Sequence, residues 1–326
     1  MTAGRFRRPL ALAAAFALLA AAMPAHAQAP YPNRTIKIVV GFAAGSGNDI
    51  IARIVGQKLQ ESLGQTIIIE NKVGAGGRLA AEMVMNSPPD GYTLLVGATG
   101  AMTITPAISV RPPYHAAKDF TPVSMMAAFP LILVVYPSHP AKNVQELIAW
   151  TKANPEKTNY ATSAPLFTLA TELFKVRTGT PGTPIPYKSS NESLVSVVGQ
   201  QSLFTIADPP PTTPLVKGGQ VRALAVLATK RLDDLPDVPT MTEAGVPDVN
   251  VSAWSGIFLP ANAPADIAKK LEGEIMKIMR MPDVQERFRQ MATPTVGSTS
   301  AELVRIINEE TQTWADVGRM ANVKLE

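Results

Sequence analysis

The residues best suited to chemistry lie in a glycine-rich turn, Gly41-Phe-Ala-Ala-Gly-Ser-Gly-Asn-Asp49. The turn follows a strand-like run (Ile36–Val40) and precedes a helix-like pattern. Backbone N–H groups freed at Gly45 and Gly47, at the positive end of a helix, favour a small anion such as a carboxylate. We therefore expect the backbone of residues 43–47 to contact an anionic ligand.

A nucleotide fits this turn poorly. A Walker loop places Lys and Ser or Thr after its last glycine, where this chain has Asn48-Asp49-Ile50. A dinucleotide-binding turn needs a third glycine where this chain has Ile50. The one partial match is Glu70, which lies near the position of the acidic residue expected at the end of the second strand. We expect Asn48 or Asp49 to cap the following helix. For Asp49 capping is favoured over ligand contact, because its charge opposes a bound anion.

Other constellations that carry catalysis are missing from the sequence. His115 and His139 stand beside prolines and are expected to be solvated, without the partners that a zinc site or a Ser-His-Asp triad requires. Gly-x-Ser-x-Gly elbows and cysteines are absent. Glu309 and Glu310 are expected to lie on a solvated helix face. We predict no catalytic residues, no metal and no cofactor.

The first residues indicate export. Three arginines among the first eight residues precede an apolar run (10–23), and Ala25-His26-Ala27 is a small-x-small cleavage site. This arrangement is typical of a secretory signal peptide over residues 1–27, with an apolar run too short to span a bilayer comfortably. We expect a soluble product in the periplasm, without disulfides because the chain lacks cysteine.

The charge balance does not point to nucleic acid. Three of the 30 basic residues and none of the 26 acidic residues lie in residues 1–27, so the remaining chain carries a formal charge of about +1. Nor does any later stretch combine dense Lys and Arg with spaced aromatic residues. Nucleic acid is therefore not an expected partner.

The elements that must position the turn alternate in type along the chain. The predicted strands are 36–40, 66–70, 92–96, 129–136, 158–162, 185–187, 203–207, 221–228 and 251–259. Helical patterns lie between most of them, and three helical segments follow the last strand. This alternation predicts parallel sheets flanked by helices, an α/β fold.

The lone late strand predicts a discontinuous first domain. We expect domain 1 to comprise residues 28–128 plus 251–326 and domain 2 to comprise residues 129–250. The chain would then cross twice between the domains, forming a hinge with a ligand cleft between the two lobes. Two consecutive domains with a helical tail are the alternative.

Short stretches in a characteristic order carry a family resemblance. They are Tyr31–Val40, Glu70–Gly77, Pro89–Leu95, Lys118–Val123, Pro186–Lys188, Arg222–Val226 and Leu235–Thr240. On these residues the chain resembles the Bug-type, or tripartite tricarboxylate transporter, periplasmic substrate-binding proteins over essentially its whole length after residue 27. The resemblance implies a two-lobed fold of the type II periplasmic-binding-protein kind, with two α/β domains joined by a two-segment hinge.

The resemblance also implies that two facing loops, one in each lobe, hold a carboxylate with main-chain donors. Their positions here are Phe42–Asp49 and residues 162–168. The expected ligand-binding residues are Phe42, Ala43, Ala44, Gly45, Ser46, Gly47, Asn48, Asp49, Thr99, Ser163, Ala164, Phe167, Thr168, Ser189, Ser190 and Asp208. The two serines either donate to the ligand or cap the next helix.

Departures from the family pattern bear on the ligand. The second loop, which is usually glycine-rich and polar, reads Ala164-Pro165-Leu166-Phe167-Thr168 here. A segment that usually reads Phe-Asp-Asn is Ile206-Ala207-Asp208, followed by three prolines. We hypothesise a ligand with an apolar or aromatic body. The alternative is that Phe167 belongs to the core of domain 2.

Together these features predict a monomeric solute receptor, not an enzyme, that captures a small organic carboxylate by hinge closure. It would deliver this ligand to integral-membrane permease subunits or present it to a sensor. An exported hydrolase or lyase that uses the same cleft is the main alternative. A receptor-like interaction module, whose altered loops no longer bind a solute, is a third.

Overall fold

The computed structural model describes residues 30–320 and 323–324, without the side chain of Met320. The predicted signal peptide, residues 1–27, lies outside these residues. Arg34–Glu326 form one compact unit, to which the following description applies. In the described part of the chain, no helix is both long and apolar enough to span a membrane.

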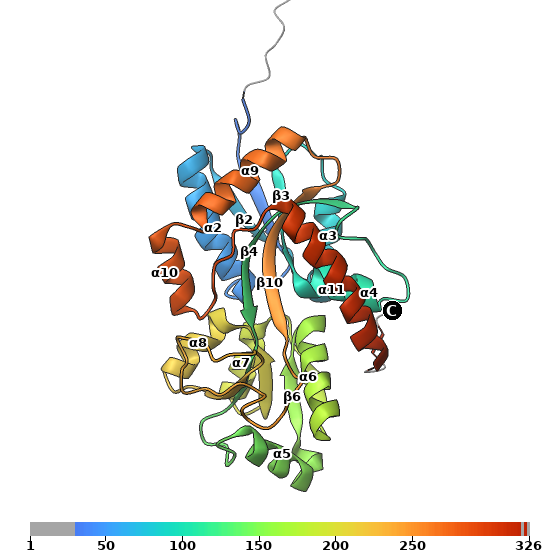
Figure 1. Cartoon of the computed structure of the whole chain (residues 1–326), viewed down its shortest axis with the longest axis vertical. Coiled ribbons are helices and arrows are strands. Elements are labelled where there is room, and N and C mark those ends of the chain that lie inside the picture. The colour runs from blue at the N-terminus through green and yellow to red at the C-terminus, as the bar shows by residue number, and fades with distance from the viewer. Residues whose placement is uncertain (1–29, 321–322, 325–326) are drawn as a thin grey trace, which may run out of the picture. The chain divides into compact units, whose positions relative to one another are not determined.

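Five strands form the first sheet, in the order β2-β1-β3-β10-β4 (Figure 1). Their bounds are β2 (Ile67–Asn71), β1 (Ile36–Val40), β3 (Thr93–Ala98), β10 (Ser252–Pro260) and β4 (Phe120–Pro130). Strand β1 pairs in parallel with β2 and β3, whereas β10 runs antiparallel to β3 and β4. The β-branched residues of β1 suit this central, buried place.

Helices cover both faces of the first sheet. Helices α2 (Gly47–Leu63) and α9 (Ala265–Ile278) pack together on one face, and α3 (Arg78–Met85) and α11 (Ser300–Met320) lie on the other (Figure 1). Trp254 and Phe258 from β10 join Leu303 and Ile307 from α11 in a buried core. The remaining helical segments beside this sheet are η1 (Ala75–Gly77), η2 (Gly100–Ile104), α4 (Thr105–Ile108) and α10 (Pro282–Gln290). We call this body lobe 1.

A second five-stranded sheet has the order β7-β6-β8-β5-β9. Its strands are β7 (Thr183–Pro186), β6 (Asn159–Thr162), β8 (Phe204–Ala207), β5 (Ile132–Val135) and β9 (Arg222–Val226). The helical segments around it are α5 (Val144–Ala153), η3 (Pro155–Lys157), α6 (Pro165–Thr178), α7 (Ser190–Val198) and α8 (Pro209–Lys217). Alternate residues of β8 face opposite ways: Phe204 packs against Phe174 of α6, and Ala207 joins Leu194 and Val197 of α7. We call this body lobe 2.

The chain passes twice between the two sheets. Leu131 alone separates β4 of lobe 1 from β5 of lobe 2, and β10 returns to lobe 1 after residue 251. The two passages are bonded through Leu227, whose N–H donates to Leu131 O at 2.8 Å and whose carbonyl accepts from Val251 N at 3.0 Å. The predicted α/β fold with two lobes and a two-segment hinge is thus confirmed. The domain boundaries at residues 128 and 250 stay a prediction.

Two local predictions are wrong, and one helix was not predicted. The single strand predicted over residues 129–136 is two strands, because β4 covers Phe120–Pro130 and turns at Leu131 into β5. The prolines after Asp208 begin helix α8, since proline is well suited to the first turn of a helix. His139 is buried between the rings of Tyr136 and Trp150 instead of being solvated.

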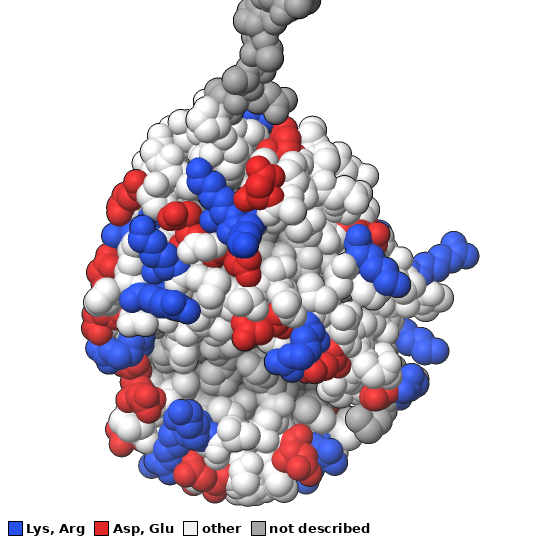
Figure 2. All heavy atoms as spheres, turned by 45° about the horizontal axis from the view of Figure 1, so that its top comes forward, with Lys and Arg blue, Asp and Glu red and all other residues white. Residues whose placement is uncertain are grey.

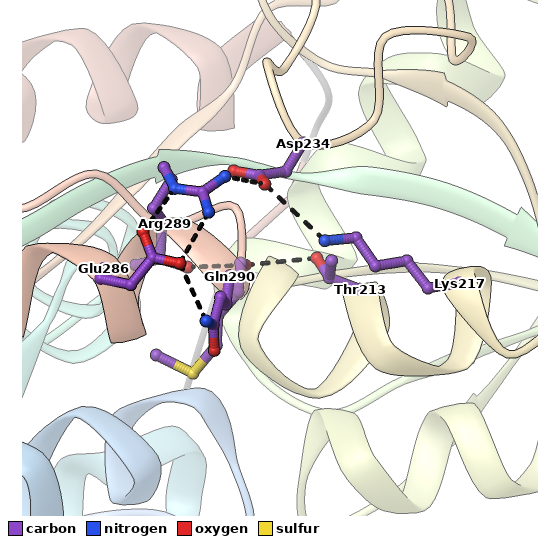
Figure 3. A network of polar contacts seen from close by, with 8 residues as sticks. Thr213, Lys217, Asp234, Glu286, Arg289 and Gln290 are labelled. Atoms are coloured by element: carbon purple, nitrogen blue, oxygen red, sulfur yellow. Dashed lines mark hydrogen bonds and ion pairs between the residues drawn. The ribbon is translucent and has the colours of Figure 1, made fainter.

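A polar network joins the lobes where α8 approaches α10 (Figure 3). Arg289 of α10 donates from Nη1 to Asp234 Oδ1 at 2.8 Å, and Lys217 Nζ of α8 lies 3.7 Å from the same oxygen. Thr213 Oγ1 of α8 also donates to Met291 O at 3.2 Å. On the face drawn in Figure 2, basic and acidic side chains are interspersed, without one broad patch of either sign.

Candidate functional site

Segments that follow four strands meet around a small cavity between the lobes. The cavity has a volume of about 20 Å³, close to the space of one water molecule. It is lined by Phe42, Asn48, Ala98, Thr99, Gly100, Phe129, Ala253 and Trp254 from lobe 1 and by Ala164, Leu166, Phe167 and Asp208 from lobe 2. We call it the inner cavity. In α/β proteins, ligands commonly bind outside the carboxyl ends of strands, as here.

A wider groove adjoins the inner cavity at Ala164. This outer groove has a volume of about 350 Å³, within the range of small-molecule sites. Its lining includes Gly76 and Arg78 from lobe 1 and Ser163 and Thr168 from lobe 2. The Arg78 guanidinium is held by Glu82 of the next helical turn, at 2.7 Å.

The start of α6 presents a positive helix end to the inner cavity. Ala164 is the N-cap and Pro165 is the first helical residue, so this first position has no N–H. The Thr168 N–H donates to Ala164 O at 3.1 Å. The backbone N–H groups of Leu166 and Phe167, in the first turn of α6, therefore have no acceptor within the helix. Both residues line the cavity. This end of α6 is suited to a carboxylate.

The glycine-rich turn in lobe 1 is organised around Asp49. Ser46 is the N-cap of α2, and its Oγ accepts from Asp49 N at 3.4 Å. The buried Asp49 carboxylate accepts from Gly45 N at 2.9 Å, from Arg53 at 2.9 Å and from Asn71 Nδ2 at 2.8 Å. Burial by itself raises the pKa of Asp49, but the hydrogen bonds from Arg53, Asn71 and Gly45 outweigh it, so the pKa is lowered. Asp49 therefore stabilises the turn as an anion.

These contacts change the interpretation of the turn. A helix cap at Asn48 or Asp49 is wrong, because Ser46 takes that place. The N–H groups of Gly45 and Ser46 are used inside the turn, donating to Asp49 Oδ2 and to Ala43 O, so neither donates to a ligand in this geometry. Asn48 lines the inner cavity, and its Oδ1 accepts a hydrogen bond from Ser255 Oγ at 2.5 Å. It lies just after residues 43–47, whose backbone was expected to contact the ligand.

Asp208 in lobe 2 is bonded less completely. It is the N-cap of α8, but its side chain makes no cap hydrogen bond, because the first three helical residues are prolines without N–H groups. The residue is 3% exposed, and its Oδ1 has no hydrogen-bond partner among the described residues. Burial raises the pKa of Asp208, and hydrogen bonds from the Ser190 side chain and the Gly47 N–H offset part of this rise.

Gly47 and Asp208 bring the two lobes into direct contact. A Cβ atom added at Gly47 would lie 1.8 Å from Asp208 Oδ2, a separation that real atoms do not tolerate. At Gly76, an added Cβ would lie 2.5 Å from Cδ of Pro165 at the start of α6. Lobe 1 therefore meets the helix starts of lobe 2 through glycines.

Trp254 lines the inner cavity and is held by two hydrogen bonds. Its backbone N–H donates to Thr99 Oγ1 at 2.8 Å, and its Nε1 donates to Glu310 Oε2 at 2.7 Å. Thr103 Oγ1 donates to the same Glu310 oxygen at 3.2 Å. Burial raises the pKa of Glu310, and the two donors offset part of the rise. The prediction that Glu310 is solvated is wrong: it is a positioning residue for Trp254.

The sixteen residues predicted from the sequence are divided among several places. Those that line the inner cavity are Phe42, Asn48, Thr99, Ala164, Phe167 and Asp208, and those that line the outer groove are Ser163, Ala164 and Thr168. Gly47 and Ser190 contact Asp208, Ser189 caps α7 by accepting from Glu192 N, and Gly45, Ser46 and Asp49 organise the turn. Ala43 and Ala44 line neither space.

Sequence reasoning missed part of the cavity wall. Phe129 and Trp254 line it from β4 and β10, and Gly100 and Ala253 lie beside them. One signal was present: a large aromatic residue at the start of the strand that returns to lobe 1. Phe167 is one of the residues that line the cavity and is also buried, at 9% exposure, so its contact with a ligand stays a prediction.

A comparison with family models decides the family. The model described as "Tripartite tricarboxylate transporter family receptor" matches residues 51–323. The chain belongs to this receptor family. Protein BugT from Bordetella pertussis is 34% identical over 300 residues, which cover 91% of this chain and 92% of that protein. The sequence resemblance to the Bug-type proteins is thus confirmed.

Solved structures of similar proteins include carboxylate complexes. An R. palustris protein with adipate is 31% identical, with a TM-score of 0.87, and the match covers 90% of this receptor and 99% of that chain. MatC from Rhodopseudomonas palustris with bound malate is 30% identical, with a TM-score of 0.85 and coverages of 88% and 99%. The family consists of substrate-binding receptors of carboxylates, and this receptor has their two-lobed fold.

Proposed function

We propose that this receptor captures a small organic carboxylate with an apolar body, by closing its two lobes around it. The observation that carries the proposal is the start of α6, where Leu166 and Phe167, whose N–H groups have no acceptor within the helix, line a cavity with mostly apolar walls. Helix ends of this kind bind carboxylates without a cationic side chain. The rings of Phe42, Phe129 and Phe167 would contact the carbon chain of the ligand.

The size of the inner cavity supports a closing motion. A space of about 20 Å³ does not admit a carboxylate with several carbon atoms, so the lobes must part for the ligand to enter. The passages at Leu131 and residue 251 are the places where such a hinge would turn, and the outer groove is the entry route that adjoins the cavity. Binding then shifts the population toward a closed form with the ligand inside.

We place the mature receptor in the periplasm as a monomer, exported by residues 1–27, with membrane permease subunits or a sensor as its partner. The location is supported by the leader pattern in the sequence and by the similarity to the periplasmic binding protein BugD, which is 28% identical with a TM-score of 0.87. Fractionation of cells that express the full chain tests it: the receptor is expected in the periplasmic fraction, with a new N-terminus near Gln28.

Ligand capture is tested by native mass spectrometry of the freshly purified receptor and by thermal shift with a panel of carboxylates. We expect a retained carboxylate and a rise in Tm with at least one member of the panel, since a ligand that binds only the folded state stabilises it. Failure of every carboxylate would favour the interaction module. Release of a chemically changed ligand would favour the hydrolase or lyase, although Asp208 is the one acidic or basic side chain in the described cavity lining.

A further inference from the structure

Asp208 places a buried acceptor in the inner cavity that the protein does not satisfy. Its Oδ1 has no hydrogen-bond partner among the described residues, and Asp208 is one of the residues that line the cavity. The prolines of α8 cannot bond it, because positions 209–211 carry no N–H groups. Buried polar atoms of this kind nearly always have a partner in the functional state.

Burial raises the pKa of the Asp208 carboxyl group and so favours its neutral form until a cation approaches. Its neighbours Ser190 and Gly47 both donate hydrogen bonds to it, which favours the charged form and offsets part of this rise. It also stands at the N-terminal ends of two helices, as the N-cap of α8 and beside Gly47, the first residue of α2. Yet none of the residues that line the described cavity is Lys, Arg or His, so no side chain there balances the charge.

The opposite side of the same cavity is suited to a negative group. Leu166 and Phe167 bring the first-turn N–H groups of α6 to it. One small cavity therefore has a seat for an anion and, apart from it, an unpaired carboxyl oxygen that needs a donor. A ligand whose only polar group is a carboxylate would bond to the N–H groups of α6. It would leave the Asp208 oxygen without a donor, and its negative charge would be repelled by an ionised Asp208.

We propose that the ligand carries a protonated amine as well as its carboxylate, and that Asp208 binds the ammonium group while the first turn of α6 binds the carboxylate. The inference rests on the proposed function and narrows its ligand class to amino acids in the broad sense. Charge-assisted hydrogen bonds between an ammonium group and a buried carboxylate are strong and short, and they discriminate against analogues that lack the donor.

The test compares pairs of ligands that differ in the amine. Adipate and 6-aminohexanoate have the same chain length but different ends, and glutarate and glutamate differ by one added ammonium group. Isothermal titration of the purified receptor with each is expected to show at least tenfold tighter binding of the amine-bearing member in at least one pair. Wider panels of α- and ω-amino acids and dicarboxylates of two to six carbons cover other spacings of the two groups.

Variants of the receptor connect the preference to Asp208. Asp208→Asn keeps the size of the side chain and removes its charge, and it is expected to weaken amine binding at least tenfold while leaving dicarboxylate binding unchanged or tighter. Asp237→Asn is the control, because this aspartate is exposed in a loop of lobe 2 and lines neither the inner cavity nor the outer groove. Circular dichroism and thermal unfolding establish that each variant is folded.

The outcomes separate the inference from the proposed function. Equal or tighter binding of the dicarboxylate in every pair, with no amino acid of the wider panel preferred, overturns the role of Asp208 and leaves the receptor function standing. An amine preference that Asp208→Asn retains also overturns it. If no member of either series binds, the proposed function fails as well. Should Asp208→Asn not fold, the wild-type comparison still decides whether the ligand bears an amine.

Discussion

Asp49 in lobe 1 and Asp208 in lobe 2 both lie at the start of a helix, and both are nearly inaccessible, at 2% and 3% exposure. Their surroundings differ. Asp49 accepts hydrogen bonds on both oxygens, from a backbone N–H, an amide and a guanidinium. Asp208 lines the inner cavity, accepts hydrogen bonds from Ser190 and Gly47, and has no partner for its Oδ1 in the described chain.

The two pKa shifts follow this difference. Hydrogen bonds outweigh burial at Asp49 and lower its pKa, whereas burial outweighs hydrogen bonds at Asp208 and raises its pKa. A carboxylate that the protein satisfies fully stabilises the fold. One that the protein leaves partly unsatisfied costs stability, and a natural protein keeps it where binding repays that cost. The contrast therefore supports a structural role for Asp49 and the proposed ligand contact for Asp208.

The sharpest test of this contrast is a matched pair of isosteric substitutions. Asp49→Asn removes the charge that holds Arg53 and replaces an acceptor oxygen with an amide that cannot accept. We expect it to lower the free energy of unfolding at pH 7 by about 3 kcal/mol. Asp208→Asn is expected to leave the free energy of unfolding unchanged or to raise it, since it removes an unpaired buried charge. Urea unfolding measures both, and equal losses would contradict the contrast.

The pH dependence of the same two variants has opposite signs. The stabilisation by Asp49 is complete above the unfolded pKa of 3.8 and is lost as the pH falls through its lower folded pKa, so the deficit of Asp49→Asn shrinks in acid. The loss of folding free energy caused by the buried Asp208 carboxylate is absent below pH 3.8, the unfolded pKa. It grows as the pH rises from 3.8 to the raised folded pKa. Any gain in the free energy of unfolding from Asp208→Asn should therefore disappear as the pH is lowered. An advantage that grows in acid would be incompatible with this account.

Gly47 joins the two regions, and a side chain there should break their contact. In Gly47→Ala the new methyl group would overlap Asp208 Oδ2, so the lobes could not close to the separation seen here. We expect ligand affinity to fall about 30-fold, which corresponds to about 2 kcal/mol, within the usual cost of overpacking. Isothermal titration measures the loss, and small-angle scattering with ligand should show a less closed form.

Gly273→Ala is the control for this substitution. Gly273 lies in α9, and a Cβ atom there meets no other atom within 4 Å. Alanine at this helical position is expected to leave ligand affinity unchanged and to raise the free energy of unfolding slightly, by up to about 1 kcal/mol. If Gly47→Ala bound ligand as tightly as Gly273→Ala, direct contact between the two regions would not be part of closure.

Much of the fold was predictable because local patterns decide it. Strand β1 was predicted at its observed bounds, since four of the five residues of Ile36–Val40 are β-branched and a glycine turn follows. Strand β4 was not, because its first residues, Phe120–Ala127, lack alternation, and the strand is defined by pairing with β10, more than a hundred residues later. Helix α8 was missed because its prolines suggest a loop unless the helix start is recognised.

The site was less predictable than the fold. The glycine-rich turn was expected to bind an anion because of Gly45 and Gly47, but which of its N–H groups remain available depends on the carboxylate of Asp49 and its partners Arg53 and Asn71. Arg53 lies one helical turn after Asp49, but nothing local in the sequence specifies the contact with Asn71, 22 residues away. The aromatic wall at Trp254 likewise depends on β10 lying between two strands from the first half of the chain.

The smallest effect on ligand affinity is expected from the ion pair that joins the lobes away from the inner cavity. Arg289 of α10 pairs with Asp234 of lobe 2 at 2.8 Å, but the Arg289 side chain is 56% exposed (Figure 3). Exposed ion pairs contribute less than about 1 kcal/mol and are screened by salt. Asp234→Asn should therefore lower ligand affinity only about two- to fivefold, because it weakens a contact that the open form would not make.

Two controls accompany the Asp234→Asn prediction: a measurement of ligand affinity at high salt and a substitution in a second arginine ion pair. At 0.5 M salt the affinities of Asp234→Asn and the wild type should converge, whereas the loss in Gly47→Ala should persist because it is steric. Arg305→Gln removes an exposed pair with Glu309 inside α11, at 2.8 Å, which does not join the lobes and should leave affinity unchanged. If Asp234→Asn reduced affinity as much as Gly47→Ala, closure would depend on surface charge rather than on the contact of Gly47 with Asp208.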